Sequence, residues 1–507
     1  MKILLIVPTY KYKTHYPSYL SVSDFPSGFA YIASSLEQAG HEVYGLNLNN
    51  IIGYQTAYDM IRDNIIYALE EVKPDLVATG GICIDYKFLK DAIQIIRDNS
   101  KVPIVLGGGI VTNDAEFVFE TLKPDYAIVG EGEDGMVRLA NGETDEKIIR
   151  SRALDVNSLP FPDWDCFGIK NMVDNFSDVT RVLYRYSRTY PKPFIIVTAR
   201  GCPFHCNFCK KHPEGYRPRS IENIMAEIAV NYEKYKFNIL IIQDELFAVN
   251  KKRMVEFCNT LIENKKTFGW DFDWMMQTHA NAKLDLDTLK LAKEAGMYLF
   301  SYGLESFSPV VLRSMNKKTK PGQVVEAIKL ADEAKVGFAG NILFGDPAET
   351  EDTVRETMMY YFQYGIDPAV FLTLVSPYPG SDIFDYCLEK GIITDKLDYY
   401  EHIDEHTYNM TQMPNHLFIE WGRLLLTIEN SYMLIKATNA DKILKVGGWS
   451  ESIHLWEVYA RCPHCGEDCV YTQLMSDAQF GQFLVPSCQH CHKRMRVNVP
   501  MELKHDN

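Results

Sequence analysis

Three cysteines crowd into eight residues as Cys202, Cys206 and Cys209, and this spacing constrains the chain more than any other feature. Three thiolates do not complete the four-ligand set of a structural zinc site. They can hold a cubane iron–sulfur cluster that leaves one iron open to a further ligand. A structural zinc with His205 or His212 as fourth ligand is the alternative.

The opening apolar run Ile3–Val7 is too short for a signal peptide, which predicts a cytoplasmic protein with reduced cysteines.

Two Cys-x2-Cys pairs near the end of the chain predict a second metal site. Cys462 and Cys465 form one pair, Cys488 and Cys491 the other, with 22 residues between them. This is typical of a zinc ribbon, in which each pair holds one side of a tetrahedral Zn²⁺. Cys469 is expected to be a bystander. A second iron–sulfur cluster is the competing interpretation, because four thiolates suit either metal.

The first 140 residues alternate between strand and helix patterns and predict a doubly wound, Rossmann-like parallel sheet. Three of the predicted strands end in glycine turns, where open α/β sheets bind ligands. For any one of them, a simple tight turn is the competing explanation. The turn residues are Thr79, Gly80 and Gly81, then Gly107, Gly108 and Gly109, then Gly130, Glu131 and Gly132.

From residue 194 to residue 380 six longer strand–helix units follow, and they predict a partial (β/α)6 barrel of the TIM type. The chemistry of such a barrel lies in the loops at the carboxyl ends of its strands. We expect five parts: a sheet domain at 1–145, a linker at 146–192, the barrel at 193–385, a helical extension at 386–455 and a zinc-ribbon-like module at 456–500.

The charge balance argues against some partners. The formal net charge is −15, and no long Lys/Arg run interrupts it, which disfavours nucleic-acid binding. The apolar stretch 417–435 contains charged residues, so it predicts an amphipathic helix and no transmembrane segment.

The segment from Cys202 to Cys209 resembles the cluster loop of radical S-adenosylmethionine (SAM) enzymes, including the aromatic Phe208 before the last cysteine. Further motifs of that family have counterparts in the same order along residues 1–395. They are Arg217–Ser220, Gln243–Phe247, Gly303–Ser306, Phe344–Thr350 and Ser376–Ser381. Pro26–Ala30 and Leu106–Gly109 resemble segments of the branch with an N-terminal cobalamin-binding domain.

The resemblance implies three cofactors: a 4Fe-4S cluster on the three cysteines, SAM on its open iron, and cobalamin on the N-terminal sheet. Zinc in the C-terminal module is the fourth predicted cofactor. The residues expected to contact SAM are Phe208, Arg219, Glu245, Gln277, Gly303, Glu305 and Ser306. Those expected to contact cobalamin are Thr79, Gly80, Gly108, Gly109, Gly130 and Glu131. No catalytic acid or base is assigned.

Two departures from the family pattern stand out. His279 follows the third strand, where many relatives carry arginine. The N-terminal domain also lacks the Asp-x-His-x-x-Gly motif that supplies a histidine to cobalt, and neither His15 nor His41 stands in such a context. If cobalamin binds, we expect it to lack a protein imidazole on cobalt.

The resemblance implies methyl transfer to an unactivated carbon or phosphorus centre through a 5′-deoxyadenosyl radical. A cyclisation or carbon–carbon bond-forming reaction on the same architecture is the alternative, and a non-catalytic metal-binding scaffold is a third possibility. An electron donor such as flavodoxin or ferredoxin is the implied partner. The sequence does not distinguish a small-molecule, lipid or peptide substrate.

Overall fold

The structure is a computed structural model of the 507-residue chain. It describes residues 1–9, 25–51, 54–175, 185–211, 214–279, 282, 284–403, 405–431, 433–448, 454–476 and 483–498. His15 and His212 lie outside the described residues. None of the helices in these ranges combines the length and apolar composition that a membrane span requires.

The chain forms two compact units, each assembled from separate stretches of sequence. Unit 1 contains residues 1–179, 208–214 and 377–407, and unit 2 contains residues 180–207, 215–376 and 408–507. Each unit is described separately below.

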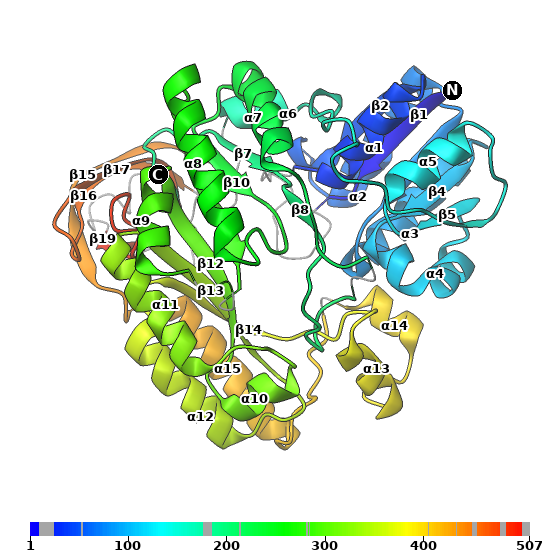
Figure 1. The fold of residues 1–507 in the computed structure, drawn as a ribbon. Helices are drawn as coiled ribbons and strands as arrows, with labels where there is room; N and C mark the ends of the chain where they lie inside the picture. Colours follow the sequence, from blue (N-terminus) through cyan, green and yellow to red (C-terminus); the bar gives the residue numbers. More distant parts are fainter. Residues whose placement is uncertain are drawn as a thin grey trace. The chain divides into compact units, whose positions relative to one another are not determined.

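Unit 1 is built on a six-stranded sheet in the order β2-β1-β3-β4-β5-β6, and every pair is parallel (Figure 1). The predicted doubly wound sheet is therefore confirmed. The strand order reverses beside β1, which is where such sheets bind ligands. The strands are β1 (Lys2–Val7), β2 (Glu42–Asn47), β3 (Leu76–Gly80), β4 (Ile104–Gly107), β5 (Tyr126–Val129) and β6 (Ile148–Arg150).

Helices connect these strands and cover the sheet. Helix α1 packs against α5, whereas α2 packs against α3 and α3 against α4. The strands β1 and β3 are buried along nearly their whole length, as expected for a parallel sheet with helices on both faces. The helices are α1 (Ser27–Gln38), α2 (Ala57–Val72), α3 (Tyr86–Asn99), α4 (Gly109–Leu122) and α5 (Gly132–Ala140).

A late segment of the chain completes unit 1. Helices α13 (Asp382–Glu389) and α14 (Lys396–Glu401) follow the last barrel strand. The Tyr400 hydroxyl donates to Asp114 Oδ2 at 2.9 Å, and its ring stacks on Phe117. Lys396 also pairs with Asp114 at 2.6 Å. These contacts attach residues 377–407 to the helices of the N-terminal sheet.

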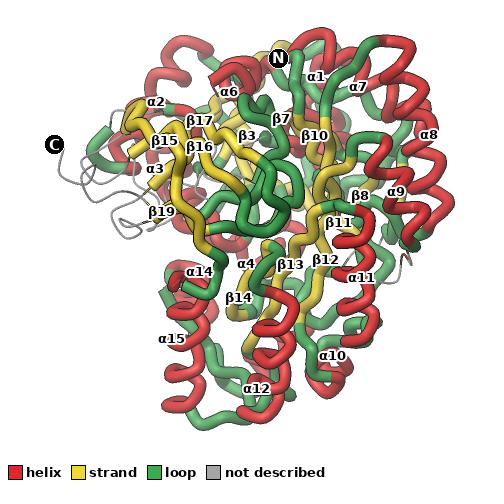
Figure 2. Tube along the Cα trace, turned by 90° about the vertical axis from the view of Figure 1, so that its left-hand side faces the viewer, coloured by secondary structure: helices red, strands yellow, loops and turns green. Residues whose placement is uncertain are grey.

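Unit 2 contains a second parallel sheet of six strands, in the order β14-β13-β12-β11-β10-β7. The partial barrel is thus confirmed, with β7 and β14 as its two edges. Figure 2 shows helices along the outer side of this sheet. The strands are β7 (Pro193–Ile196), β10 (Ile239–Ile242), β11 (Asp273–Thr278), β12 (Met297–Glu305), β13 (Gly337–Phe344) and β14 (Ala369–Leu374). The helices are α7 (Ile221–Tyr235), α8 (Lys251–Phe268), α9 (Leu286–Glu294), α10 (Pro309–Ser314), α11 (Pro321–Ala334) and α12 (Glu351–Tyr360).

The barrel strands alternate between buried residues and residues facing an open interior. Gln277 and Asn341 are exposed and Ser301 is half-buried, whereas their neighbours along each strand are mostly buried. Because successive side chains of a strand point to opposite faces, these polar residues share the inner face of the sheet.

The end of the chain forms a third sheet, in the order β17-β16-β15-β19-β18. Its strand β15 (Ala437–Gly448) lies within the 386–455 stretch that we expected to be helical, so the helical part ends with α15 (Asn415–Ser431). The residues of β15 form a strand because β16 (His454–Arg461) pairs with them in antiparallel register. The other strands are β17 (Asp468–Ser476), β18 (Phe483–Leu484) and β19 (Arg496–Asn498).

Candidate functional site

The cysteine loop follows the first barrel strand, β7, after the short strand β8 (Ala199–Arg200). Cys202 and Cys206 lie in unit 2, where Cys202 is half-buried and Cys206 is buried. The Asn207 side chain donates to the Ser314 carbonyl at 2.9 Å, and the Asn316 side chain donates to the His205 carbonyl at 2.6 Å. The turn after α10 therefore fixes the shape of this loop.

The same turn supplies a buried cation beside the cysteines. Lys317 Nζ lies 2.7 Å from Glu305 Oε1, and both side chains are less than one-tenth exposed. Burial raises the pKa values of Cys202 and Cys206, and the Lys317 charge works against that rise. A nearby cation favours thiolate, which is the form that ligates iron.

Gly303 makes room for this ion pair. A Cβ at Gly303 would overlap Glu305 Oε1 and lie 2.7 Å from Lys317 Nζ. Glu305 itself has a φ of 59°, which is rare for a non-glycine residue, and the register between β12 and β13 shifts at this point. Strained backbone of this kind gathers at functional sites. The sequence motif indicates Gly303 and Glu305 but not Lys317, because Lys318 and Lys320 beside it suggest an exposed basic turn.

His279 also lies in this neighbourhood. Its ring stacks on Phe204 of the cysteine loop, with centroids 4.0 Å apart, and its Nε2 is 3.4 Å from Thr319 Oγ1. Burial, followed by the Lys317 charge, lowers the pKa of His279 to about 3. The residue is therefore a neutral packing partner of the loop.

Two acidic residues follow β10. Asp244 is buried and accepts hydrogen bonds from the Thr198 backbone at 2.6 Å and the Thr198 hydroxyl at 2.5 Å, and burial raises its pKa to about 6. Glu245 is exposed and accepts a hydrogen bond from the Gly201 backbone at 2.9 Å. Both residues thus hold the segment that enters the cysteine loop, and Glu245 keeps a solvent-facing side chain.

Two of the residues predicted to contact SAM point into the protein interior. The Arg219 guanidinium pairs with buried Glu227 and donates to the Val197 carbonyl at 2.8 Å. Ser306 Oγ lies 3.0 Å from Thr357 Oγ1 and accepts from the Ser308 backbone at 3.0 Å. These contacts give both side chains structural partners.

A cavity of about 290 Å³ lies inside the barrel. Its polar lining includes Gln243, Gln277, Ser301 and Asn341, and its apolar lining includes Met275 and Phe371. The Arg185 guanidinium lies over the Phe371 ring, 5.3 Å from its centroid. The cavity can therefore accept a ligand that carries several hydrogen-bonding groups.

The last part of the cysteine loop belongs to unit 1. Phe208 is half-buried and Cys209 is exposed. Lys211, two residues further on, pairs with Asp382 at 2.7 Å within the same unit.

The glycine turns of the N-terminal sheet fall into two kinds. A Cβ at Gly80 would overlap the Gly107 carbonyl oxygen, and one at Gly108 would lie 2.6 Å from the Gly81 carbonyl oxygen. These two glycines let the neighbouring turns pack together. The Thr79 hydroxyl joins β3 to β1 by donating to the Ile6 carbonyl at 2.8 Å. Gly107 differs, since a Cβ there would meet nothing within 4 Å.

The remaining predicted cobalamin contacts lie at the starts of α4 and α5. Gly109 is the first residue of α4, and Glu131 immediately precedes α5. Gly130 has a φ of 94°, and its backbone donates to Thr112 Oγ1 at 3.1 Å. All these residues share the carboxyl edge of the sheet.

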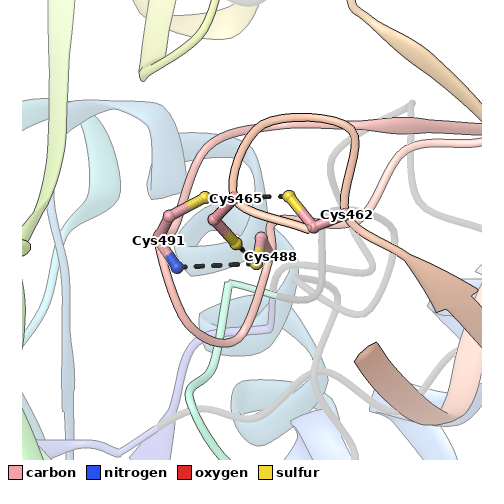
Figure 3. A group of neighbouring side chains, drawn as sticks. All are labelled: Cys462, Cys465, Cys488 and Cys491. Atoms are coloured by element: carbon pink, nitrogen blue, oxygen red, sulfur yellow. Dashed lines mark hydrogen bonds between the residues drawn. The ribbon is translucent and has the colours of Figure 1, made fainter. Parts of the chain in front are cut away.

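The four C-terminal cysteines converge on one point (Figure 3). Their sulfur atoms all lie within 4.8 Å of one another, and the Cys462–Cys491 and Cys465–Cys488 separations are both 3.7 Å. Cys469 is outside this group, although its sulfur is 3.6 Å from that of Cys488. The predicted set of four is thus brought together.

Comparison with known proteins agrees with this geometry. Residues 196–360 match the model of the radical SAM superfamily, and residues 25–140 match that of the B12 binding domain. A protein of Pyrococcus horikoshii named as an uncharacterized methyltransferase is 26% identical over 78% of this chain and 84% of its own length. An anaerobic magnesium-protoporphyrin IX monomethyl ester cyclase of Cereibacter sphaeroides is 26% identical over 80% of this chain and 66% of its own length.

Among solved structures, the radical SAM methyltransferase TsrM from Kitasatospora setae, with cobalamin and a 4Fe-4S cluster bound, has a similar fold. The TM-score is 0.58 at 16% identity, covering 77% of this chain and 75% of TsrM. The fold, the cysteine loop and the two domain matches lead to one conclusion. The chain is a radical SAM protein with an N-terminal B12-binding domain.

Proposed function

We propose that this protein is a cobalamin-dependent radical SAM methyltransferase. The observation that carries the proposal is the presence of a B12-binding domain at 25–140 and a radical SAM domain at 196–360 in one chain. The relative from Pyrococcus horikoshii and the structural neighbour TsrM are both named methyltransferases. We assign residues 1–145 to cobalamin binding and residues 193–385 to the radical SAM barrel, apart from 208–214 and 377–385, which belong to unit 1.

The donor set of the cysteine loop fits an iron–sulfur cluster with an open iron. Cys202, Cys206 and Cys209 supply three thiolates, and Lys317 provides positive charge near the first two. When bound, the cluster and SAM together supply a 5′-deoxyadenosyl radical. Glu305, oriented by Lys317, and Gln277, on the open inner face of the barrel, are the residues that we expect to hold SAM.

The carboxyl edge of the N-terminal sheet fits a wide, flat corrin. Gly107 leaves its α-carbon uncovered at the end of β4, so backbone can approach a ligand there. Gly108 is exposed at the start of α4, so backbone can approach a ligand there as well. Cobalamin supplies a cobalt-bound methyl group when it is present, and the exposed start of α4 at Gly108 is the place where we expect its tail.

The cyclase relatives favour a second candidate function. The Cereibacter sphaeroides cyclase is as similar in identity to this chain as the Pyrococcus horikoshii protein. A non-methylating radical reaction on the same two domains is therefore the alternative to methyl transfer. In either case we propose flavodoxin or ferredoxin as the electron donor, because a radical SAM reaction begins with reduction of the cluster.

We further propose that Cys462, Cys465, Cys488 and Cys491 bind zinc. A zinc–sulfur bond of about 2.3 Å places tetrahedral ligands about 3.8 Å apart. The 3.7 Å separations of two sulfur pairs match one metal ion at the centre of the group. A cubane cluster would spread the thiolates over four separate irons and therefore hold them further apart. The alternative of a second iron–sulfur cluster is thus disfavoured.

Cofactor content tests the proposed function. Anaerobically reconstituted protein, passed over a desalting column after incubation with iron, sulfide and hydroxocobalamin, should show iron–sulfur and corrinoid absorption together. We expect about one corrinoid and about four irons per chain, as one cubane cluster requires. A protein that keeps the cluster but no corrinoid would favour the non-methylating alternative, and a protein that keeps neither would contradict both.

A further inference from the structure

Residues 492–498, which follow the second cysteine pair, contact the beginnings of several barrel strands. Each of these contacts lies at the end of the barrel opposite the cysteine loop, since that loop follows the carboxyl end of β7. The C-terminal sheet lies beside the barrel sheet in the ribbon view (Figure 1). The stretch that provides the contacts, His492–Arg494, begins one residue after the ligand Cys491.

Arg494 makes the most extensive contact. Its side chain is 2% exposed, and its Nη2 donates to the carbonyls of Ile366 at 3.0 Å and Val370 at 3.5 Å. Its backbone N–H donates to the Asp367 carbonyl at 2.8 Å. These three partners form the approach to β14 and its start, and β14 is one edge of the barrel sheet.

The first cysteine pair supports Arg494 directly. His464, between Cys462 and Cys465, donates through Nε2 to the Arg494 carbonyl at 3.0 Å. The Cys488 backbone donates to the Lys493 carbonyl at 2.9 Å, which closes the second cysteine turn just before Arg494. Both halves of the four-cysteine site therefore determine where the Arg494 guanidinium lies.

His492, two residues before Arg494, contacts the central strands β12 and β13 of the barrel. His492 is buried, and its ring lies 5.5 Å from that of Tyr298, the second residue of β12. A Cβ at Gly337, which starts β13, would lie 2.6 Å from the His492 Cβ. The close approach explains why glycine begins this strand. Lys493 adds an ion pair of 2.9 Å with Asp332 at the end of α11.

The other edge of the barrel is held by β17. The Thr472 hydroxyl donates to the Thr189 carbonyl at 2.6 Å, four residues before β7 begins. Ser187 and Arg188 bind Asp273 at the start of β11, at 2.6 and 2.7 Å. The C-terminal module thus reaches the approaches to both edge strands, β7 and β14, which do not pair with each other in the described sheet.

We propose that the four-cysteine metal site is a brace that holds the two open edges of the barrel together at its amino-terminal end. The inference rests on the zinc site proposed above, but not on methyl transfer. The metal fixes the 488–494 turn, and the turn fixes the start of β14. Arg494 lies 5.7 Å from the ring centroid of Phe371, a cavity-lining residue, so the brace also supports one wall of the cavity.

The module packs partly against the barrel, and it also buries apolar side chains of its own such as Val458, Tyr471 and Leu474. Buried Ile435 and Val485 form one cluster, and the residue that packs against them from the barrel is Ile366. The metal adds a link between the two cysteine turns, which together position Arg494 against the start of β14.

The test is hydrogen–deuterium exchange on the full-length protein with zinc content measured in parallel. Cys491→Ser should lose one zinc per chain, and amides at 366–374 and 189–196 should exchange at least about tenfold faster. Amides of the N-terminal sheet, residues 2–7 and 76–80, should be unchanged. Cys469→Ser is the matched control, because Cys469 is a buried thiol beside Cys488 but outside the group of four.

Each outcome decides a different point. Loss of zinc without faster exchange at 366–374 would overturn the brace, whereas retention of zinc in Cys491→Ser would overturn the metal site itself. Zinc loss in Cys469→Ser would overturn the assignment of ligands. If Cys491→Ser does not accumulate in soluble form, Arg494→Met supplies the test. This variant should keep its zinc and still show faster exchange at 366–374, and normal exchange there would contradict the proposal.

Discussion

A buried pair of opposite charges organises the mouth of the barrel. Glu305 and Lys317 are 2.7 Å apart and almost completely removed from solvent. Removing one partner of such a pair costs about 3–5 kcal/mol, because the other charge is left buried alone. A Cβ at residue 303 would press on both charged groups, so Gly303 gives the pair the space that its present geometry uses.

At the residue scale, we predict that Gly303→Ala impairs the site without loss of the cluster. The added methyl group would displace Glu305 and Lys317, and a misplacement of about 1 Å costs about 10²-fold in rate. The formation of 5′-deoxyadenosine under reducing conditions should fall by about that factor while iron content stays normal. Gly322→Ala is the control, since a Cβ there meets nothing within 4 Å. An unchanged rate in Gly303→Ala would contradict the role of the pair.

A second residue-scale prediction concerns Glu349, in the turn between β13 and α12. Burial raises its pKa to about 8, and Oε2 accepts from the Gly345 backbone at 2.6 Å. Since the folded state holds this proton more tightly than the unfolded state, stability is lost as pH rises from about 4.5 to about 8. The expected loss is about 1.4 kcal/mol per pH unit in this window.

Urea unfolding of Glu349→Gln between pH 6 and pH 8 checks this contribution. The variant should lack the contribution of Glu349 to the pH dependence. Its free energy of unfolding should therefore fall less steeply with rising pH than that of the wild type. Glu351→Gln, which changes a partly exposed carboxylate at the start of the same helix, should keep the wild-type slope. Equal slopes in Glu349→Gln and the wild type would refute the buried, protonated carboxyl.

At the scale of elements, the sequence predicted most of the sheets and helices because hydrophobic periodicity is a local signal. The six strands predicted between residues 194 and 380 are present in the barrel sheet, from β7 to β14. Strand β15 was missed, since it depends on pairing with β16 and not on its own pattern. The same distinction between local and tertiary signals applies to the residues of the site. Glu305 was recognisable from its motif, whereas Lys317 reaches the site only through the tertiary position of the turn after α10.

The carboxyl edge of the N-terminal sheet gives a prediction at this scale. We expect Gly107→Leu to keep the fold and lose corrinoid, because its side chain would enter the open space above β4. Corrinoid retained after desalting should fall at least about tenfold, while circular dichroism and iron content stay normal. Gly108→Leu is a poorer test, since Gly108 has a φ of 84° and packs against Gly81. Normal corrinoid content in Gly107→Leu would place the ligand elsewhere.

At the scale of the molecule, the chain does not divide into consecutive blocks. Residues 208–214 and 377–407 belong to the same compact unit as the N-terminal sheet. In the sequence, however, residues 208–214 lie within the barrel segment and residues 377–407 follow it. Composition and periodicity could not show this, because the assignment depends on contacts between residues far apart, such as Tyr400 with Asp114. The cysteine loop itself contributes Cys202 and Cys206 to one unit and Cys209 to the other.

The central claim is that one chain uses SAM and cobalamin together to transfer a methyl group. The most direct test needs no knowledge of the substrate: cobalamin-loaded, reduced protein is incubated with SAM that carries a ¹³C-labelled methyl group. The bound corrinoid is then analysed by mass spectrometry. We predict ¹³C-methylcobalamin on the protein together with an equal amount of S-adenosylhomocysteine. Formation of 5′-deoxyadenosine with a corrinoid that stays unlabelled would contradict the claim.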